Sequence, residues 1–141
     1  MKIRNSIECW IYNKVQGRFL LLQCPETEKH RAYWQPVTGG LNQGESEEAA
    51  CIREVEEETG ILFSENALIR VVDRFTVPVP QEDFLLVKPV FAVETTQHRV
   101  TISDEHLAHR WTKPDEVKAL LLWDSNRYTF KLVNRRLGLI S

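Results

Sequence analysis

The sequence has few cysteines, no long hydrophobic run and almost no net charge. Its three cysteines, Cys9, Cys24 and Cys51, are an odd set without metal-ligand spacing, so we expect reduced, mostly buried thiols. No run of about 18 apolar residues occurs, so we expect no membrane-spanning helix. The net charge of −2 argues against non-specific binding to a nucleic-acid backbone. These absences predict a cytoplasmic protein that binds neither membrane nor DNA.

What the chain does contain predicts one folded domain. The first ten residues lack the apolar stretch of a secretory signal, so we expect none. The 141 residues suit a single domain, and a hydrophobic content of 43% is enough for a sizeable core. No internal repeat, low-complexity tract or linker divides the chain. We therefore expect residues 1–141 to form one domain.

Glutamates are concentrated between residues 39 and 61, where they fill seven of 23 positions. Glu54, Glu57 and Glu58 stand at i, i+3 and i+4, which places three carboxylates on one face of a helix. Like charges at that spacing destabilise an isolated helix by roughly 0.2–0.5 kcal/mol per pair. Mg²⁺ and Mn²⁺ prefer oxygen ligands and would offset the repulsion. The cluster therefore predicts a divalent-metal site, and an ordinary solvated charged helix is the alternative.

The residues around the cluster predict the limits and the orientation of this helix. Ser46 is a favourable N-cap, and Gly60 supplies the stop at the C-terminal end. Cys51, Ile52 and Val55 lie on a face turned away from the three glutamates. We therefore expect the helix to bury its apolar face and to expose its acidic face.

The whole stretch resembles a complete Nudix box. The defining positions are filled, in order, by Gly39, Glu45, Arg53, Glu54, Val55, Glu57, Glu58, Thr59, Gly60 and Ile61. A chance match to so many fixed positions is very improbable. The chain thus resembles the Nudix hydrolases, also called MutT-like. The resemblance implies an α+β fold in which a mixed β-sheet is sandwiched between α-helices, and the loose order of expected strands and helices agrees with a layered α+β domain.

The resemblance also implies hydrolysis of a phosphoanhydride in a nucleoside-diphosphate-linked substrate, with Mg²⁺ and possible use of Mn²⁺. The metal-binding glutamates of the family correspond to Glu54, Glu57 and Glu58, and a backbone carbonyl would come from Gly39 or Gly40. Cations held there can neutralise and align a diphosphate and lower the pKa of a bound water. Hydrolysis at phosphorus is therefore the expected chemistry.

Further roles follow from the same comparison of positions. Arg53 corresponds to the residue that orients a glutamate, and it lies four positions before Glu57. Glu45 corresponds to a position that supports the loop and helix. The general base often lies outside the box, and our candidate is Glu105, with a solvated turn carboxylate as the alternative. Glu57 or Glu58 could instead activate the water itself.

Substrate contacts are expected from aromatic and basic side chains near the loop. Trp34 precedes the glycines and Trp111 follows the candidate base, and either could stack on a nucleobase or pterin. Arg31 could pair with a terminal phosphate. Tryptophans are more often core residues, and a solvated surface arginine is an equal alternative for Arg31.

Residues 33–40, 105–111 and 123–127 resemble segments of bacterial dihydroneopterin triphosphate/dATP pyrophosphohydrolases. This favours a nucleoside or pterin triphosphate as a small-molecule substrate, cleaved to a monophosphate and pyrophosphate by a monomer or homodimer. The enzymatic alternatives are dinucleoside polyphosphates, nucleotide sugars and RNA 5′-triphosphate ends. A non-catalytic nucleotide-sensing module is the alternative of another class.

Alternation and turn residues predict the other elements of the fold. Strands are expected within residues 3–13, 18–23, 67–77, 84–93, 99–102 and 109–112, the first two as a hairpin. Pro78 to Pro80 should interrupt the third strand, and Pro89 should place a bulge or an edge in the fourth. Pro114 should open a C-terminal helix with a break near residues 124–125.

Overall fold

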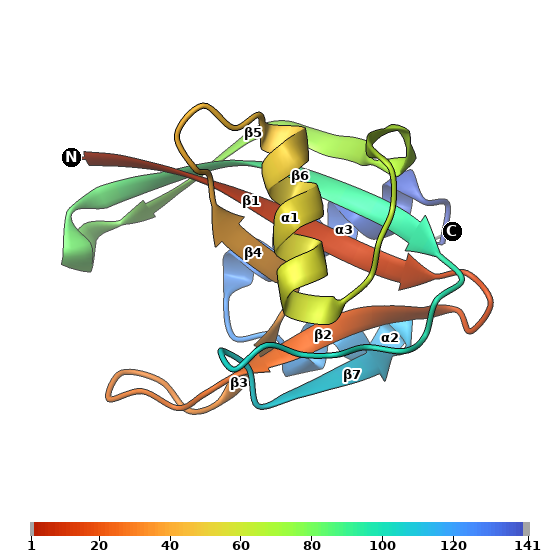
Figure 1. Ribbon diagram of the computed structural model, residues 1–141. Helices are drawn as coiled ribbons and strands as arrows, with labels where there is room; N and C mark the ends of the chain where they lie inside the picture. The colour runs from red at the N-terminus through yellow and green to blue at the C-terminus, as the bar shows by residue number, and fades with distance from the viewer. Residues whose placement is uncertain (1, 140–141) are drawn as a thin grey trace.

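The computed structural model describes residues 2–139 (Figure 1). Within that range the chain forms one mixed sheet and helices on both of its faces, as the resemblance implied. The elements are, in order, β1 (Lys2–Asn13), β2 (Arg18–Cys24), β3 (Tyr33–Gln35), β4 (Val37–Gly40), α1 (Glu47–Thr59), η1 (Glu65–Ala67), β5 (Ile69–Val79), η2 (Pro80–Glu82), β6 (Phe84–Thr95), β7 (Ala108–Thr112), α2 (Pro114–Leu120) and α3 (Asp124–Arg136).

The sheet has the strand order β3-β2-β1-β6-β5, with β4 paired to β1 and β7 paired to β2. The central pair, β1 and β6, is parallel, and the other pairs are antiparallel. β1 and β2 pair as the expected hairpin. β4 lies beside β1, so the glycines at its end are held against the middle of the sheet.

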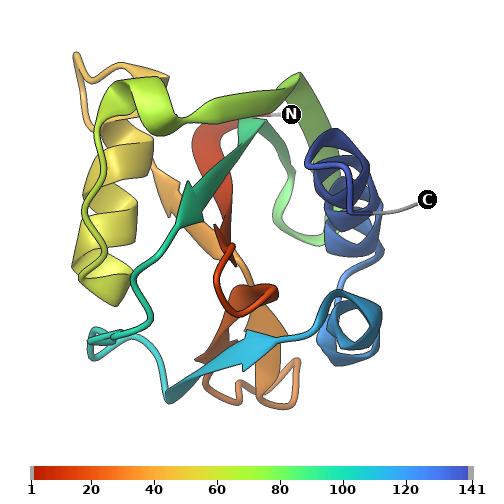
Figure 2. The same cartoon turned by 90° about the vertical axis from the view of Figure 1, so that its right-hand side faces the viewer.

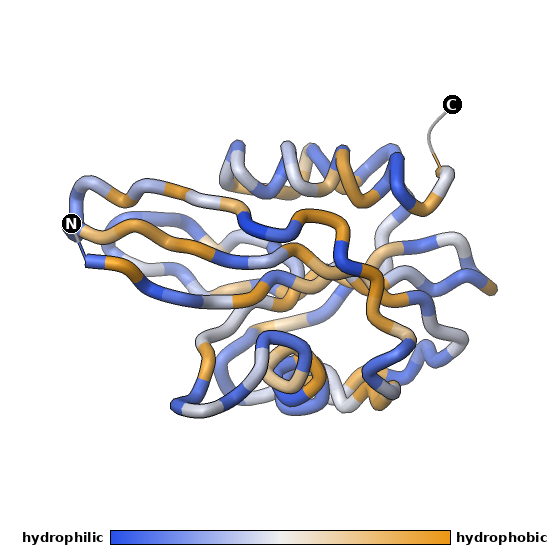
Figure 3. Tube along the Cα trace, turned by 90° about the horizontal axis from the view of Figure 1, so that it is seen from above, coloured by the Kyte–Doolittle hydropathy of each residue, from blue (hydrophilic) through white to orange (hydrophobic). Residues whose placement is uncertain are grey.

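Two apolar clusters lie on the two faces of the sheet, because alternate residues of β1 point in opposite directions. Ile7 and Ile11 belong to the cluster that includes Val55 of α1. Trp10 belongs to the cluster that includes Phe130 of α3. Figures 2 and 3 show the resulting layers, with α1 on one side of the strands and α3 on the other.

The strand predicted around Pro89 is present, but it is not an edge strand. β6 lies between β1 and β5. The β5–β6 register shifts between Val72–Val90 and Phe75–Lys88, opposite the proline, whereas the β1–β6 register keeps the same offset on both sides of it. Because proline has no N–H to donate, it is tolerated in the interior of a sheet where the ladder is interrupted. The bulge alternative therefore describes this strand.

Two strand predictions were wrong. β5 continues through Pro78, which pairs with Leu85. β5 is the last strand in the order, and an edge strand tolerates a missing donor. Residues 99–102 form no strand; they run beside the end of α1, where the Thr101 N–H donates to the Thr59 carbonyl at 2.9 Å.

The C-terminal break falls slightly earlier than expected. α2 ends at Leu120 and α3 begins at Asp124, so residues 121–123 form the connection. Leu121 forms an isolated bridge with Trp34 of β3, which holds this connection against the sheet. None of the helices within residues 2–139 is long and apolar enough to cross a membrane. The three cysteines are buried and unpaired, as expected.

Candidate active site

α1 begins and ends where its flanking residues predict. The Ser46 side chain accepts a hydrogen bond from the Ala49 N–H at 3.0 Å. At the other end Gly60 has a left-handed backbone with φ of 76°, and its N–H donates to the Glu56 carbonyl at 2.9 Å. These caps place the three clustered glutamates in the second half of the helix.

The acidic face of α1 is not uniformly exposed, which corrects the sequence prediction. The side chain of Glu57 is 56% exposed, whereas those of Glu54 and Glu58 are 14% and 4% exposed. Glu58 lies three residues after Val55 and seven after Cys51, so it continues the buried stripe of the helix. Glu54 lies against Gly39, where an added Cβ would come within 2.1 Å of Glu54 Cδ.

Arg53 connects the glycine loop to the glutamates. Its Nε and Nη2 both donate to the Glu45 carboxylate at 2.8 Å. Its Nη1 donates to Glu54 at 2.7 Å and, more weakly, to Glu57 at 3.3 Å. Its Nη2 also donates to the Gly40 carbonyl at 2.8 Å. The contact with Glu57 was expected, and the contacts with Glu45 and Glu54 are shorter.

This contact pattern sets the electrostatics of the loop. The hydrogen bonds from Arg53 and from the Asn42 N–H lower the pKa of Glu45 to about 2. Glu45 therefore remains charged near neutral pH and fixes one side of the guanidinium. The other side of the guanidinium is left to hold Glu54 and Glu57.

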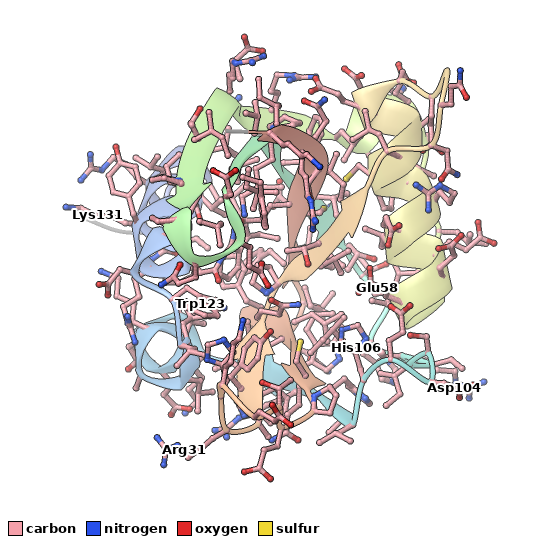
Figure 4. The ribbon with its side chains drawn as sticks, turned by 90° about the vertical axis from the view of Figure 1, so that its left-hand side faces the viewer. Arg31, Glu58, Asp104, His106, Trp123 and Lys131 are labelled. Atoms are coloured by element: carbon pink, nitrogen blue, oxygen red, sulfur yellow. The ribbon has the colours of Figure 1, made fainter. Side chains whose placement is uncertain are left out.

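Glu58 faces His106, with 3.4 Å between Glu58 Oε1 and His106 Nε2 (Figure 4). Burial and the neighbouring Glu54, Glu105 and Glu57 raise the pKa of Glu58 to about 10. Burial lowers the pKa of His106. The two shifts in pKa both favour the uncharged forms of these side chains, so burial works against an ion pair between them. Glu58 Oε2 and His106 Nδ1 are buried without a hydrogen-bond partner among residues 2–139.

The donor atoms at this end of α1 suit a hard divalent cation. Among residues 2–139, no three His, Cys, Asp or Glu side chains already converge to hold a metal ion. Arg53 draws Glu54 and Glu57 aside, while Glu58 turns toward His106. The oxygen donors are nevertheless the type that Mg²⁺ and Mn²⁺ prefer. A buried carboxyl oxygen without a partner, as on Glu58, is costly and indicates an unmet ligand.

Glu105 lies in the loop before β7 and is exposed. Its N–H donates to Ser103 Oγ at 3.4 Å, and the next residue is the buried His106. The charge of Glu105 contributes to the raised pKa of Glu58, and Glu105 directly precedes His106, whose Nε2 lies 3.4 Å from Glu58. In Figure 4 the adjacent Asp104 points outward, away from Glu58.

The structure does not gather Arg31, Trp34 and Trp111 around the glutamates. Arg31 is exposed in the loop between β2 and β3 and points outward (Figure 4). Trp34 packs against the apolar cluster on the α3 side of the sheet. Trp111 packs against the cluster on the α1 side, and its Nε1 donates to the His98 carbonyl at 2.9 Å.

A cavity of about 730 Å³, which the sequence analysis missed, lies between the β5–β6 hairpin, β4 and the start of α3. Its lining includes the exposed ring of Trp123 and the buried side chains of Lys88 and Asn126. Lys88 is the one charged residue in the apolar run of residues 84–93, and Glu8 is a lone acid among apolar residues of β1. Those two isolated charges were the signal that could have revealed the cavity.

Comparisons with known proteins identify a family model and a relative that both match most of this chain. A family model described as the NUDIX domain matches residues 2–133. The bis(5′-nucleosyl)-tetraphosphatase [asymmetrical] of Rattus norvegicus is 27% identical over 114 residues, which cover 80% of this chain and 76% of that protein.

Solved structures share the fold. The E. coli dihydroneopterin triphosphate pyrophosphohydrolase has a TM-score of 0.77 and 24% identity, covering 95% of this chain and 99% of that one. A MutT NUDIX hydrolase from Burkholderia pseudomallei has a TM-score of 0.79 and 21% identity, covering 94% and 99%. At these identities the structural likeness establishes the arrangement of strands and helices.

Proposed function

The chain belongs to the NUDIX domain family, and from that membership we propose that it hydrolyses a nucleoside or dihydroneopterin triphosphate to a monophosphate and pyrophosphate. As a Nudix pyrophosphohydrolase it is an enzyme that acts on a nucleotide-like small molecule. The observation that carries the proposal is the carboxylate cluster at the end of α1. Arg53 holds Glu54 and Glu57 there, and Glu58 keeps a buried oxygen without a partner.

We assign the metal-binding role to Glu54, Glu57 and Glu58, together with a carbonyl of Gly39 or Gly40. Mg²⁺ is the expected cation and Mn²⁺ the alternative, because both take oxygen ligands. When bound, such a cation supplies positive charge for polyphosphate oxygens and lowers the pKa of a coordinated water. Glu54 supports this assignment by lying directly against Gly39.

Arg53 has a positioning role in this proposal. Its guanidinium contacts Glu45, Glu54, Glu57 and the Gly40 carbonyl at once. Because Glu45 remains charged and binds two nitrogens of Arg53, the guanidinium cannot rotate freely. The cluster is thereby held in place before substrate arrives, which reduces the reorganisation needed during reaction.

Hydrolysis requires a group that accepts a proton from the attacking water. The water oxygen bonds to phosphorus, the bridging P–O bond breaks, and pyrophosphate leaves as the anion. We assign the proton to Glu105, because this exposed carboxylate directly precedes His106, which faces Glu58, and can release the proton to solvent. Glu57 and Glu58 are the alternative acceptors. Arg31, exposed in the loop between β2 and β3, remains our candidate for a terminal phosphate.

A second substrate class has a specific basis. The curated relative from Rattus norvegicus is a bis(5′-nucleosyl)-tetraphosphatase, and it aligns with 80% of this chain. A dinucleoside tetraphosphate contains the same phosphoanhydride linkage as a triphosphate. The carboxylate cluster would serve both substrates, so the chemistry at the end of α1 does not separate them.

A product-release panel tests the proposal. It compares nucleoside triphosphates, dihydroneopterin triphosphate, dinucleoside tetraphosphates and nucleotide sugars, each with Mg²⁺ and with excess chelator. Pyrophosphate released from a triphosphate only with Mg²⁺ supports the favoured class. Turnover of the dinucleoside tetraphosphates alone would shift the assignment to the second class. Substrate binding without any turnover would instead favour a sensing role.

A further inference from the structure

β4 separates the carboxylate cluster from the cavity of about 730 Å³. Thr38 lines the cavity, while the next residue, Gly39, contacts Glu54 on the other side. Consecutive residues of a strand point to opposite faces, which explains how one short strand borders both places. A substrate whose polyphosphate lies at α1 can therefore place its other end in the cavity.

The floor of the cavity is built around the carboxylate of Glu8, which is 0% exposed. Glu8 Oε1 receives Lys88 Nζ at 2.7 Å and Asn126 Nδ2 at 3.1 Å. Glu8 Oε2 receives Trp10 Nε1 at 2.7 Å and Thr129 Oγ1 at 2.6 Å. These four donors occupy the accepting positions of the carboxylate, so Glu8 organises its neighbours and does not itself reach a ligand.

This arrangement fixes what Lys88 and Asn126 present to the cavity. The Lys88 ammonium has three N–H groups, and one of them is directed to Glu8. The Asn126 amide must turn its NH₂ toward Glu8, which leaves its Oδ1 as an acceptor on the other side. Both side chains are at least nine-tenths buried, at 4% and 3% exposure. A cationic donor thus lies beside a neutral acceptor at the bottom of a cavity whose walls mix apolar side chains with polar ones such as Gln35 and Thr38.

From this arrangement we propose that the cavity binds a bicyclic heterocycle bearing an oxo group flanked by a ring N–H. This inference rests on the proposed function, because the heterocycle would be part of the substrate. The oxo group accepts from Lys88, and the N–H donates to Asn126 Oδ1. Guanine presents adjacent N7 and O6 acceptors, the pair that a lysine ammonium recognises. An oxo-pterin presents the same kind of edge. Adenine carries an amino donor where guanine carries oxygen, so Lys88 would oppose it.

The wall of the cavity suits a flat ring. Trp123 is 38% exposed, and its ring meets that of His30 edge to face with 4.7 Å between centroids. Figure 4 places Trp123 well apart from Glu58, on the side of the molecule where α2 and α3 meet. An exposed aromatic held in position by its neighbours offers a surface for stacking. The ring would stack on Trp123 while its polar edge meets Lys88 and Asn126.

Binding of monophosphates to the full chain, by calorimetry in chelator without added metal, tests this inference independently of catalysis. Inosine and adenosine monophosphates are a matched pair, because their bases differ in the 6-oxo and 6-amino groups. We expect the inosine compound to bind at least about tenfold more tightly, since the amino group would face a charged donor. Equal affinities, tighter binding of the adenine compound, or no binding of either at millimolar concentration would overturn the inference.

Variants test whether the preference for inosine monophosphate arises from Lys88 at the floor of the cavity. Glu8→Gln combined with Lys88→Met removes the pair without leaving one buried charge alone, and we expect it to abolish the preference for inosine monophosphate. Lys131→Met is the matched control, because Lys131 is exposed on α3 and points outward (Figure 4). A preference that survives the double substitution contradicts the role of Lys88. If the double variant does not fold, the comparison on the unmodified chain still decides.

Two further ligands test whether the cavity prefers a purine ring or a pterin ring. Guanosine monophosphate and neopterin both carry the oxo edge, and the tighter of the two indicates whether a purine or a pterin is the natural ring. Tighter binding of inosine than of adenosine monophosphate, without turnover of any polyphosphate, would support the cavity assignment and remove the proposed reaction. Equal binding of the two monophosphates, together with Mg²⁺-dependent turnover, would support the proposed reaction and remove the cavity assignment.

Discussion

Arg53 and Glu45 are joined by two parallel hydrogen bonds of 2.8 Å, from Nε to Oε2 and from Nη2 to Oε1. Eight residues separate them in the chain, so this contact ties the loop before α1 to the middle of the helix. Glu45 Oε1 also accepts from the Asn42 N–H at 2.9 Å, which closes the loop on itself. The remaining nitrogen of Arg53 is thereby directed at Glu54 and Glu57.

Replacing Arg53 with lysine should impair catalysis more than folding. A lysine keeps the positive charge but has no planar fork, so it cannot bind Glu45 at two points and also reach Glu54. We expect turnover to fall by about 10–100-fold, the range for residues that orient metal ligands. Steady-state kinetics should place the loss mainly in kcat, with an unchanged circular dichroism spectrum.

Arg70→Lys is the matched control for this substitution. Arg70 also bridges acidic residues of α1, with its Nη2 3.1 Å from both Glu47 and Glu48, but it is distant in sequence from the glutamate cluster. We expect its replacement to leave turnover within about twofold of the original, since exposed ion pairs contribute little. Comparable losses in the two variants would contradict a specific role for Arg53.

The same contact predicts how the protein responds to acid. The pKa of Glu45 is lowered to about 2 by Arg53 and Asn42, against about 4.3 in an unfolded chain. A lowered folded-state pKa contributes stability that is present above the unfolded value and is lost as pH falls toward 2. Glu45→Gln should therefore flatten the dependence of the urea midpoint on pH between about 5 and 2.

Glu26→Gln serves as the comparison for the acid experiment, because Glu26 is exposed in the loop after β2. We expect that variant to keep the acid dependence of the unmodified protein. If Glu45→Gln and the unmodified protein lose stability in parallel over this range, the short contacts with Arg53 do not hold in solution.

How far the sequence predicts this site depends on how local each feature is. The caps of α1, the contact between Arg53 and Glu57, and most strands follow from spacings of a few residues, and the structure confirms them. The burial of Glu58 depends on His106, which approaches from a loop nearly fifty residues later. The pairing of Glu8 with Lys88 depends on a parallel pair of distant strands. Such long-range contacts have no signature within a single stretch of sequence.

Substituting a glutamate of the cluster should lower turnover far more than substituting a neighbouring glutamate on the same helix. Glu57→Gln and Glu58→Gln each remove a proposed metal ligand, and we expect metal-dependent turnover to fall by at least about 10–100-fold. Glu58→Gln should retain the fold, because glutamine has the shape of the uncharged acid that burial favours there. Glu56→Gln, on the exposed face, should remain active. Unchanged turnover in both cluster variants would remove the metal assignment.

Gly39→Ala should weaken metal binding by displacing the Glu54 side chain. An added Cβ would lie 2.1 Å from Glu54 Cδ, so the Glu54 side chain must move away. We expect Mn²⁺ affinity, measured by electron paramagnetic resonance, to fall by about tenfold or more while the fold persists. Gly40→Ala should lower that affinity less, because its added Cβ meets no atom within 4 Å. A larger effect at Gly40 than at Gly39 would contradict the placement of Glu54.

The choice of Glu105 as the proton acceptor leads to the sharpest kinetic test. Glu105→Gln keeps the size and polarity of the side chain but removes its basicity, so kcat should fall by about 10²–10⁴-fold. Asp104→Asn is the control, because Asp104 is the adjacent acid and points away from Glu58 (Figure 4). Mn²⁺ affinity should stay the same in both variants, which separates proton transfer from metal binding. A loss of less than about threefold for Glu105→Gln, well below the usual range, would transfer the role to Glu57 or Glu58, whose substitution also removes a metal ligand.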